Sequence, residues 1–462
     1  MPMYSDSPTK NKRPNVIWIL SDQHRAQATG YRGDCNARTP NMDRLATTGA
    51  NFINAYSGYP LCCPFRGSLL TSVYPNKCVP GHEYALPEGM RTIADCFNSE
   101  GYDTFYLGKW HLDGAKEKDV PTNVHIVPPN RRGGFKKWVG YENNNSQYDC
   151  WMHGHKDEQE VPLFRVKGYE TDALTDLFID YLDEKHETHE PFFAVLSVQP
   201  PHEPHVAPPE YMGKYNPAEI KLRPNVPSSD KLVAKVRRDL AGYYAQIENF
   251  DYNVGRILKH LIDSGDYFNT HIIIMSDHGD CRGSNGHLRK NIPFEEAIRI
   301  PFIISGEVPA PYNFDGRLSG DIDEALINHV DIAPTTLGLC GIEKPQWMEG
   351  TDYSGYRLEW RKKPEDKPDS VYLQSIVPTL HGNGADRPWR GIVTRDGWKY
   401  ACFEEMPWLM FNLNEDPYEM VNLALEPPYL TKRAELHQKL QQWIDRTKDD
   451  FKLPVIRTTR NL

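Results

Sequence analysis

Short runs of apolar residues recur along the first two thirds of the chain. The first run is NVIWIL at residues 15–20, and it ends at Ser21 and Asp22. A continuous apolar run of this length, closed by polar residues, is typical of a strand that is buried on both faces of a parallel sheet. Similar runs follow along the chain, at residues 104–107, 192–198, 271–275 and 301–304.

Helical patterns alternate with these runs. Apolar residues recur at helical spacing in four segments, at residues 92–100, 170–184, 230–264 and 332–340. The alternation of buried strands with helices predicts an α/β fold, in which a mainly parallel sheet carries helices on both faces. Polar side chains that follow such strands are expected at one edge of the sheet, where α/β proteins place their sites.

The pattern of residues along the chain changes after Gly341. Short strand-like segments lie at residues 371–374, 391–394, 398–403 and 409–412. The step at 395–397 is typical of a hairpin turn. A final helix at residues 431–449, with Leu436, Leu440 and Trp443 at helical spacing, is expected to pack on the small sheet. We therefore predict a large α/β domain, residues 1–367, and a small C-terminal α+β subdomain with an antiparallel sheet, residues 368–462.

Composition and net charge disfavour some classes of binding partner. The chain has 462 residues, 39% apolar and 11% aromatic, which is enough for a large core. The 53 basic and 63 acidic residues give a net charge of −10. This charge disfavours nucleic acids and anionic membranes, so that an anionic ligand needs a local basic pocket.

The nine cysteines and the N-terminal residues bear on the compartment. Apart from one adjacent pair, the cysteines are scattered singly, without the spacing of a zinc site. Residues 1–14 are polar, and no stretch approaches the roughly 20 apolar residues that span a bilayer. We predict a soluble protein with reduced thiols in the cytoplasm, unless a signal was removed from the chain.

The adjacent cysteines open the most informative motif, CCPFRGSLLT at residues 62–71. Alone, such a pair is more often buried packing or half of a disulfide. The run resembles the signature of the sulfatase family, C-x-P-x-R before a leucine-rich helix, in which a maturation enzyme oxidises the cysteine to formylglycine. The resemblance implies that Cys62 is the precursor of an aldehyde. One hydroxyl of the aldehyde hydrate attacks sulfur, and the other later expels the sulfate.

Two pairs of polar residues follow predicted strands. Asp22 and Gln23 come after the first strand, and Asp277 and His278 come after the strand near residues 271–275. Oxygen ligands of this kind suit hard cations. The resemblance implies that these four residues and residue 62 bind one divalent metal. Gln23 and His278 stand where the family more often has Asp and Asn, so that calcium is the first expectation and the nitrogen ligand leaves manganese open.

Other motifs of the family carry further roles by resemblance. In GKWH, residues 108–111, Lys109 would contact the sulfate, and His111 would orient or deprotonate the diol. In QPPHEPH, residues 199–205, His202 would protonate the leaving group, and His205 would reach the substrate.

Two more basic residues complete the predicted pocket. In GHLRK, residues 286–290, Lys290 would contact the transferring group. Arg66 lies about one turn beyond residue 62, at the start of a helix that is expected to open near Gly67, and it would support the oxidised residue and the carboxylates. Phe65 departs from the family, which usually has a small residue there.

The matched motifs run from residue 15 to about residue 301, and LNEDPYE at 413–419 also resembles the family. The resemblance implies an alkaline phosphatase-like α/β/α sandwich with a large mixed, mainly parallel sheet. It also implies the hydrolysis of a sulfate monoester, with an aryl, alkyl or carbohydrate sulfate as substrate and a formylglycine-generating enzyme as partner.

Alternatives remain open. Phosphonate monoester and phosphodiester hydrolases use the same modified cysteine and often carry the variants seen at Gln23 and His278. A non-catalytic anion- or sugar-binding relative, in which Cys62 stays a thiol, is a third hypothesis. Arg387 lies in an irregular aromatic and basic stretch that could line a substrate pocket or pack within its own loop. The sequence predicts neither the natural substrate nor the oligomeric state.

Overall fold

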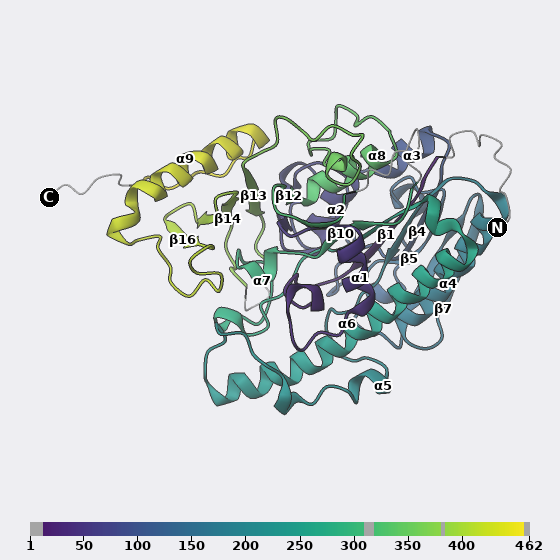
Figure 1. The fold of residues 1–462 in the computed structure, drawn as a ribbon, viewed down its shortest axis with the longest axis horizontal. Coiled ribbons are helices and arrows are strands. Elements are labelled where there is room, and N and C mark those ends of the chain that lie inside the picture. The colour runs from purple at the N-terminus through teal and green to yellow at the C-terminus, as the bar shows by residue number, and fades with distance from the viewer. Residues whose placement is uncertain (1–12, 309–317, 380–383, 457–462) are drawn as a thin grey trace, which may run out of the picture.

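A ten-stranded sheet forms the centre of the protein (Figure 1). The computed structural model describes residues 13–308, 318–379 and 384–456. Across the sheet the strands are β11 (Gly320–Ile322), β2 (Ala50–Phe52), β10 (Phe302–Ser305), β9 (Thr270–Ser276), β1 (Asn15–Ser21), β8 (Phe192–Ser197), β4 (Asp103–Lys109), β5 (Lys137–Tyr141), β6 (Trp151–Lys156) and β7 (Gln159–Arg165).

The middle of this sheet is parallel and its edges are mixed. β1 pairs in parallel with β8 on one side and with β9 on the other, and β4 is parallel to both β8 and β5. β10 runs antiparallel to β9 and β2, and β6 and β7 form an antiparallel pair. The predicted mixed, mainly parallel sheet is therefore confirmed.

Helices cover both faces of the sheet. Alternate residues of β1 divide between two cores, with Ile17 and Ile19 in one and Val16, Trp18 and Leu20 in the other. The first core also holds residues of α1 (Pro40–Thr48), α4 (Glu170–Thr188) and α6 (Asp230–Ser264). The second holds residues of α2 (Cys62–Thr71), α3 (Ile93–Ser99) and α8 (Ile332–Leu339). The result is the predicted three-layer α/β/α sandwich.

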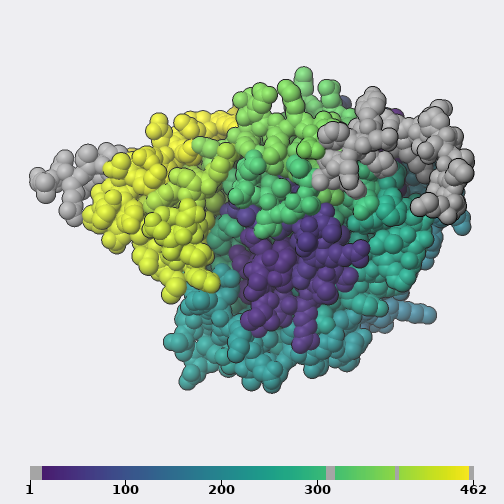
Figure 2. All heavy atoms as spheres, in the orientation of Figure 1, coloured from purple at the N-terminus to yellow at the C-terminus, as the bar shows by residue number. Residues whose placement is uncertain are grey.

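The last part of the described chain adds a small antiparallel sheet. Its strands, in order, are β13 (Ser370–Ser375), β14 (Trp389–Thr394), β15 (Trp398–Cys402) and β16 (Pro407–Asn412). Helix α9 (Leu430–Thr447) buries the expected side chains, Leu436, Leu440 and Trp443, against it. In Figure 2 this part, in yellow, forms a lobe at one end of the molecule. The division of the chain near residue 368 stays a prediction.

Several details differ from the sequence-based expectation. Helix α2 begins at Cys62, so the start near Gly67 is wrong. Proline has no N–H to donate, and this costs nothing in the first turn, which is where Pro64 lies. Strands β5, β6 and β7, which complete one side of the sheet, were not predicted, and β7 is largely exposed and lacks a continuous apolar run.

Short elements complete the described chain. They are α5 (Pro209–Met212), α7 (Glu295–Ile298) and the paired strands β3 (Ala55–Tyr56) and β12 (Ile327–Asn328). All nine cysteines lie in the described ranges and are free thiols. No helix in these ranges is long and apolar enough to cross a membrane.

Candidate active site

The predicted site residues come together at the carboxyl edge of the parallel strands. Asp22 and Gln23 follow β1, Asp277 and His278 follow β9, and Lys109 ends β4. The loop after β8 carries His202, and Cys62 is the first residue of α2. Since the carboxyl ends of parallel strands meet at one edge, residues far apart in sequence reach a common point.

Cys62 lies at the centre of this group. Its Sγ atom is 3.7 Å from a carboxylate oxygen of Asp22, 3.2 Å from Nε2 of His278 and 3.3 Å from Nζ of Lys290. Burial, followed by the charge of Asp22, raises the pKa of the Cys62 thiol to about 11. The thiol itself is therefore protonated near neutral pH and is a poor nucleophile.

Buried cations hold the carboxylates in place. Lys109 Nζ donates to Asp22 at 2.6 Å, and the Arg66 guanidinium lies 3.3 Å from Asp22 and 3.2 Å from Asp277. Burial alone would raise the pKa of Asp22, but Lys109 and the other neighbouring positive groups outweigh it and hold that pKa well below its usual range. Arg66 also donates to the Lys109 carbonyl and to Ser197 Oγ, both at 2.9 Å. The Arg66 guanidinium thus connects the ends of four strands, β1, β9, β4 and β8.

Four of these groups could hold a divalent cation. The potential ligand atoms of Asp22, Cys62, Asp277 and His278 all lie within 4.8 Å of one another, and all four residues are buried. Nδ1 of His278 donates to the Gly279 carbonyl at 2.9 Å, which leaves Nε2 with a lone pair facing the group. Two carboxylates and a neutral imidazole fit a metal such as calcium or manganese.

Gln23 extends the donor set. It has a left-handed backbone, with φ of 69°, and its side-chain oxygen accepts from Lys290 Nζ at 2.6 Å. Its Nε2 donates to Glu203 and to Asp280, both at 2.7 Å. These bonds fix the amide so that its oxygen lies toward Lys290. Neither supporting carboxylate was predicted as a site residue, although Glu203 stands inside the quoted motif of residues 199–205.

Three backbone bonds fix the loop that carries His111. The Glu142 carboxylate accepts from the backbone N–H groups of Leu112, Asp113 and Gly114, at 3.1, 3.0 and 3.0 Å. His111 itself is 3% exposed, and burial, followed by the charge of Lys109, lowers its pKa well below the usual range. The imidazole is therefore neutral and can accept a proton.

His202 is also neutral. Its Nδ1 donates to the Glu203 carbonyl at 2.7 Å, which leaves Nε2 as the ring nitrogen available to a substrate. Burial, followed by the charge of Lys290, lowers the pKa of His202 to about 3. An anionic group nearby would raise this pKa, because it would stabilise the imidazolium.

A cavity of about 640 Å³ opens above the group. Its lining includes five predicted site residues, Cys62, Lys109, His111, His202 and Lys290. It also includes polar residues that sequence reasoning missed, His82, Glu117, Asn143, Asn145, Glu203, Arg289, Asn291 and Thr379. Glu203 and Arg289 stand inside the quoted motifs next to predicted residues, whereas the others lie in loops without a recognisable signal.

Two predicted substrate contacts lie elsewhere. His205 bonds to the Gln246 side chain at 3.0 Å and is outside the lining of this cavity. Arg387 forms an ion pair with Glu405 and lies 4.5 Å from the centre of the Phe403 ring, in the small subdomain. The structure does not bring either residue to the cavity, so we assign no substrate contact to them.

Comparison with known families agrees with this geometry. The sulfatase family matches residues 14–342, and the family described as N-sulphoglucosamine sulphohydrolase, C-terminal, matches residues 283–446. The chain therefore belongs to the sulfatase family, and it is an enzyme that hydrolyses sulfate esters.

Individual relatives cover nearly the whole chain. An ulvan-active sulfatase of Formosa agariphila is 36% identical over 97% of this chain and 83% of its own length. An endo-4-O-sulfatase of Bacteroides thetaiotaomicron is 28% identical over 90% of this chain and 89% of its own. A Bacteroides fragilis structure that carries the sulfatase name yidJ superposes with a TM-score of 0.84 and 28% identity, covering 96% of this chain and 98% of that one.

The fold is shared more widely. The phosphonate monoester hydrolase of Agrobacterium radiobacter superposes with a TM-score of 0.72 at 21% identity, over 94% of this chain and 96% of that one. At this identity the likeness concerns the fold alone.

Proposed function

We propose that the chain hydrolyses a sulfate monoester with formylglycine at position 62 as its nucleophile. The position of Cys62 carries this proposal, since Cys62 lines the cavity and its Sγ atom lies 3.2 Å from His278 and 3.3 Å from Lys290. The hydrate of formylglycine would supply a hydroxyl to attack sulfur and a second hydroxyl through which sulfate is later released. A formylglycine-generating enzyme is the partner that this proposal requires.

One divalent metal belongs to the proposal. Asp22, Gln23, Asp277 and His278, together with residue 62, would hold it, and calcium remains the first choice with manganese as the alternative. When bound, the metal polarises the ester and the nucleophile. Arg66 would keep Asp22 and Asp277 ionised and oriented in this arrangement.

The remaining residues have distinct roles. Lys109 and Lys290 are cations that can bind the sulfate oxygens, on which charge grows in the transition state. His111 is a neutral base that can accept the proton of the nucleophile. His202 offers Nε2 to the leaving group, and an anionic ester in the cavity would favour the imidazolium that donates this proton.

A carbohydrate sulfate is the substrate class that we propose. The cavity of about 640 Å³ can hold a sugar unit beyond the sulfate. Its outer lining includes Glu117, Asn143 and Asn145, and side-chain amides and carboxylates suit sugar hydroxyls. The names of two relatives, an ulvan-active sulfatase and an endo-4-O-sulfatase, support the same class.

Phosphonate monoester or phosphodiester hydrolysis is the second candidate. Gln23 and His278 support it, since such hydrolases often carry these two residues at the metal-site positions. The likeness to a phosphonate monoester hydrolase concerns the fold only. A non-catalytic role does not agree with membership in an enzyme family whose proposed site residues are all present.

A comparison of two substrates tests the choice. The mature enzyme would be assayed with an aryl sulfate and with the matching aryl phosphonate monoester, and kcat/KM would be compared. We expect the sulfate to react faster. A higher kcat/KM for the phosphonate would reverse the assignment. The cytoplasmic compartment remains a prediction.

A further inference from the structure

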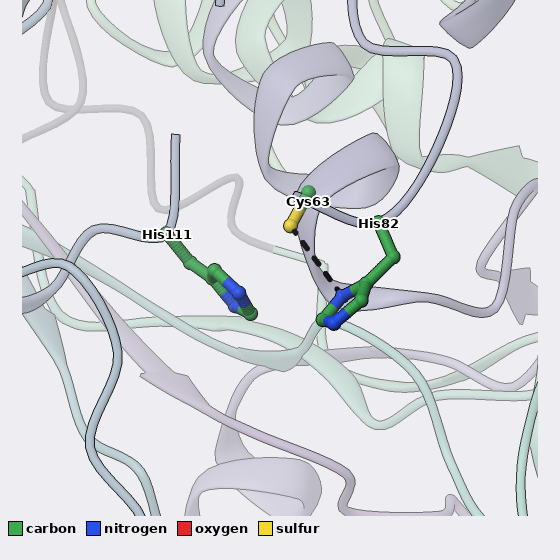
Figure 3. A group of neighbouring side chains, drawn as sticks. All are labelled: Cys63, His82 and His111. Carbon is green, nitrogen blue, oxygen red and sulfur yellow. Dashed lines mark hydrogen bonds between the residues drawn. The ribbon is translucent and has the colours of Figure 1, made fainter. Parts of the chain in front are cut away.

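A second group of metal-ligating side chains lies beside the active site (Figure 3). It consists of Cys63, the second residue of α2, His82, in the loop that follows α2, and His111, in the loop after β4. The figure shows the two imidazoles pointing toward each other below the Cys63 thiol. Cys63 is fully buried, and both histidines line the cavity. The group therefore has a closed side and a side that an ion can reach.

The distances are close to those of a metal site. One potential ligand atom from each residue lies within 4.8 Å of the others, and Cys63 Sγ is 4.0 Å from Nδ1 of His82. The two rings are nearly perpendicular, at 87°, with centroids 5.5 Å apart. Around zinc, with bonds of about 2.3 Å to sulfur and about 2.0 Å to nitrogen, ligand atoms lie roughly 3.3–3.6 Å apart. Small rotations of the three side chains would bring the ligand atoms to these separations.

Two further observations point to a ligand. Nδ1 of His111 is buried and has no hydrogen-bond partner among the described residues, and leaving a buried nitrogen unsatisfied is unfavourable. The backbone N–H of Glu83 donates to Cys63 Sγ at 3.4 Å, and a thiolate accepts such a bond more strongly than a thiol. Both features suit a bound cation.

We propose that Cys63, His82 and His111 form a second metal site, specific for a borderline or soft divalent ion such as zinc. A thiolate and two imidazoles select such ions, whereas the carboxylate-rich group around Asp22 selects hard ones. Three protein ligands leave a fourth position open to the cavity, which makes the site exchangeable. Binding replaces the thiol proton of Cys63 by the metal and releases that proton to solvent, so no oxidant is needed.

Occupation of this site would inhibit the enzyme, a consequence that rests on the proposed role of His111. A neutral imidazole has one N–H and one lone pair. When the metal takes the lone pair, the proton stays on the other nitrogen, and the ring can no longer accept a proton from the nucleophile. The site thus couples hydrolysis to the concentration of free zinc.

Cobalt binding tests the site without turnover. The full-length Cys62→Ala variant, in excess calcium, would be titrated with Co²⁺, and the thiolate-to-cobalt charge-transfer absorption would be recorded. Removal of Cys62 leaves Cys63 as the thiol next to the cavity. We expect an absorption that saturates with a single ion, is displaced by Zn²⁺ and is absent when Cys63→Ser is added.

Two controls keep the test decisive. Cys35→Ser removes the exposed cysteine and should leave the absorption unchanged. If Cys63→Ser does not fold by circular dichroism, His82→Ala replaces it, and it should weaken cobalt affinity at least about tenfold. The proposal is overturned if no charge-transfer absorption appears, if it survives Cys63→Ser, or if His82→Ala leaves the affinity unchanged.

Inhibition is measured separately on the mature enzyme. Zn²⁺ should lower its activity, and a chelator selective for zinc over calcium should restore it. Cys63→Ser should raise the half-inhibitory zinc concentration at least about tenfold, with each variant normalised to its own zinc-free rate. A cobalt signal without inhibition by zinc would contradict the role of His111 while the metal site stands. Inhibition that is unchanged in Cys63→Ser would contradict the site.

Discussion

At the scale of single residues, buried cations make the site locally positive. Lys109, Arg66 and Lys290 surround Asp22 and Cys62 and are themselves buried or half-buried. Each cation contacts a carboxylate or residue 62, and Lys109 and Lys290 also line the cavity, where they can meet an anionic ester. The site can thus attract sulfate although the whole chain carries a charge of −10.

Lys290→Ala should lower kcat by roughly 10²–10³, because it removes a cation 3.3 Å from Cys62 Sγ that would meet charge developing in the transition state. Steady-state kinetics of the mature enzyme measure this loss. Lys259→Ala, which removes an exposed lysine paired with Asp263 on α6, is the matched control and should leave kcat unchanged. Equal rates for Lys290→Ala and the wild type would remove this lysine from the mechanism.

Arg66→Met should reduce the free energy of unfolding of the metal-free protein by about 3–5 kcal/mol, because it leaves the buried carboxylates of Asp22 and Asp277 without their shared partner. Denaturant titration in a chelating buffer measures the change. Arg38→Met, at an exposed arginine 3.7 Å from Glu248, should change stability by less than about 0.5 kcal/mol. A similar small effect for both variants would show that Arg66 does not stabilise the carboxylates.

At the scale of elements, the sequence predicted the strands and helices that have a clear apolar pattern and missed strands that are short or largely polar. Strands β1, β4, β8 and β9 were found because they are buried on both faces, and α6 was found because its apolar residues recur at helical spacing. The three-residue strands β2 and β11 contain too few positions to show a period. Their pairing is decided by neighbours far away in the chain.

The candidate site likewise contains residues that the sequence could predict and residues that it could not. Asp22 and Asp277 could be placed because each follows a buried strand, and the ends of such strands meet. His82, Glu117 and Asn143 could not, because their nearness to the cavity depends on how loops fold over the sheet edge. Local pattern carries no information on that distance, so tertiary structure was needed to find them.

A buried ion pair joins helix α9 to the small sheet. The Asp449 carboxylate, just after α9, accepts from Arg390 of β14 at 2.7 and 2.8 Å and from the hydroxyl of Tyr372 at 2.9 Å. Burial would raise the pKa of Asp449, but its bonds with Arg390 outweigh burial and lower that pKa. The pair therefore fixes the end of the helix on the small sheet.

Asp449→Asn should destabilise the folded protein by about 3–5 kcal/mol at pH 7, because it leaves the Arg390 charge buried without a partner. The folded-state pKa of Asp449 lies below the unfolded value of about 3.9, so its stabilisation is complete above that value and is lost as the pH falls through the folded pKa.

Unfolding free energies measured between neutral and acidic pH test both the loss of stability at pH 7 and its dependence on pH. Asp450→Asn, which changes the exposed neighbour, is the control, and its unfolding free energy should still fall at acidic pH as in the wild type. In Asp449→Asn the part of this fall that Asp449 causes should be absent. Equal stability of the two variants at pH 7 would contradict the structural role of the pair.

At the scale of the whole molecule, metal binding should couple activity to stability. A divalent ion that binds the buried group of the folded chain, and not the unfolded chain, would stabilise the fold by about 2.7 kcal/mol at a concentration of 100 times its Kd. Removal of the ion by a chelator should abolish turnover and lower the melting temperature.

Calcium or manganese should restore both activity and melting temperature, and the ion with the larger effect at equal concentration identifies the preferred metal. Magnesium, which demands a tighter octahedral shell, serves as the comparison. Full activity in a metal-free protein, verified by elemental analysis, would contradict the proposed metal site.

The central proposal is that residue 62 works as formylglycine. The most direct measurement is the mass and fragmentation of the tryptic peptide of residues 45–66, from protein produced together with a formylglycine-generating enzyme. We predict that position 62 has exchanged its sulfur for oxygen, that Cys63 has kept its sulfur, and that activity rises with the modified fraction. An active protein whose Cys62 is entirely unmodified would contradict the proposed mechanism.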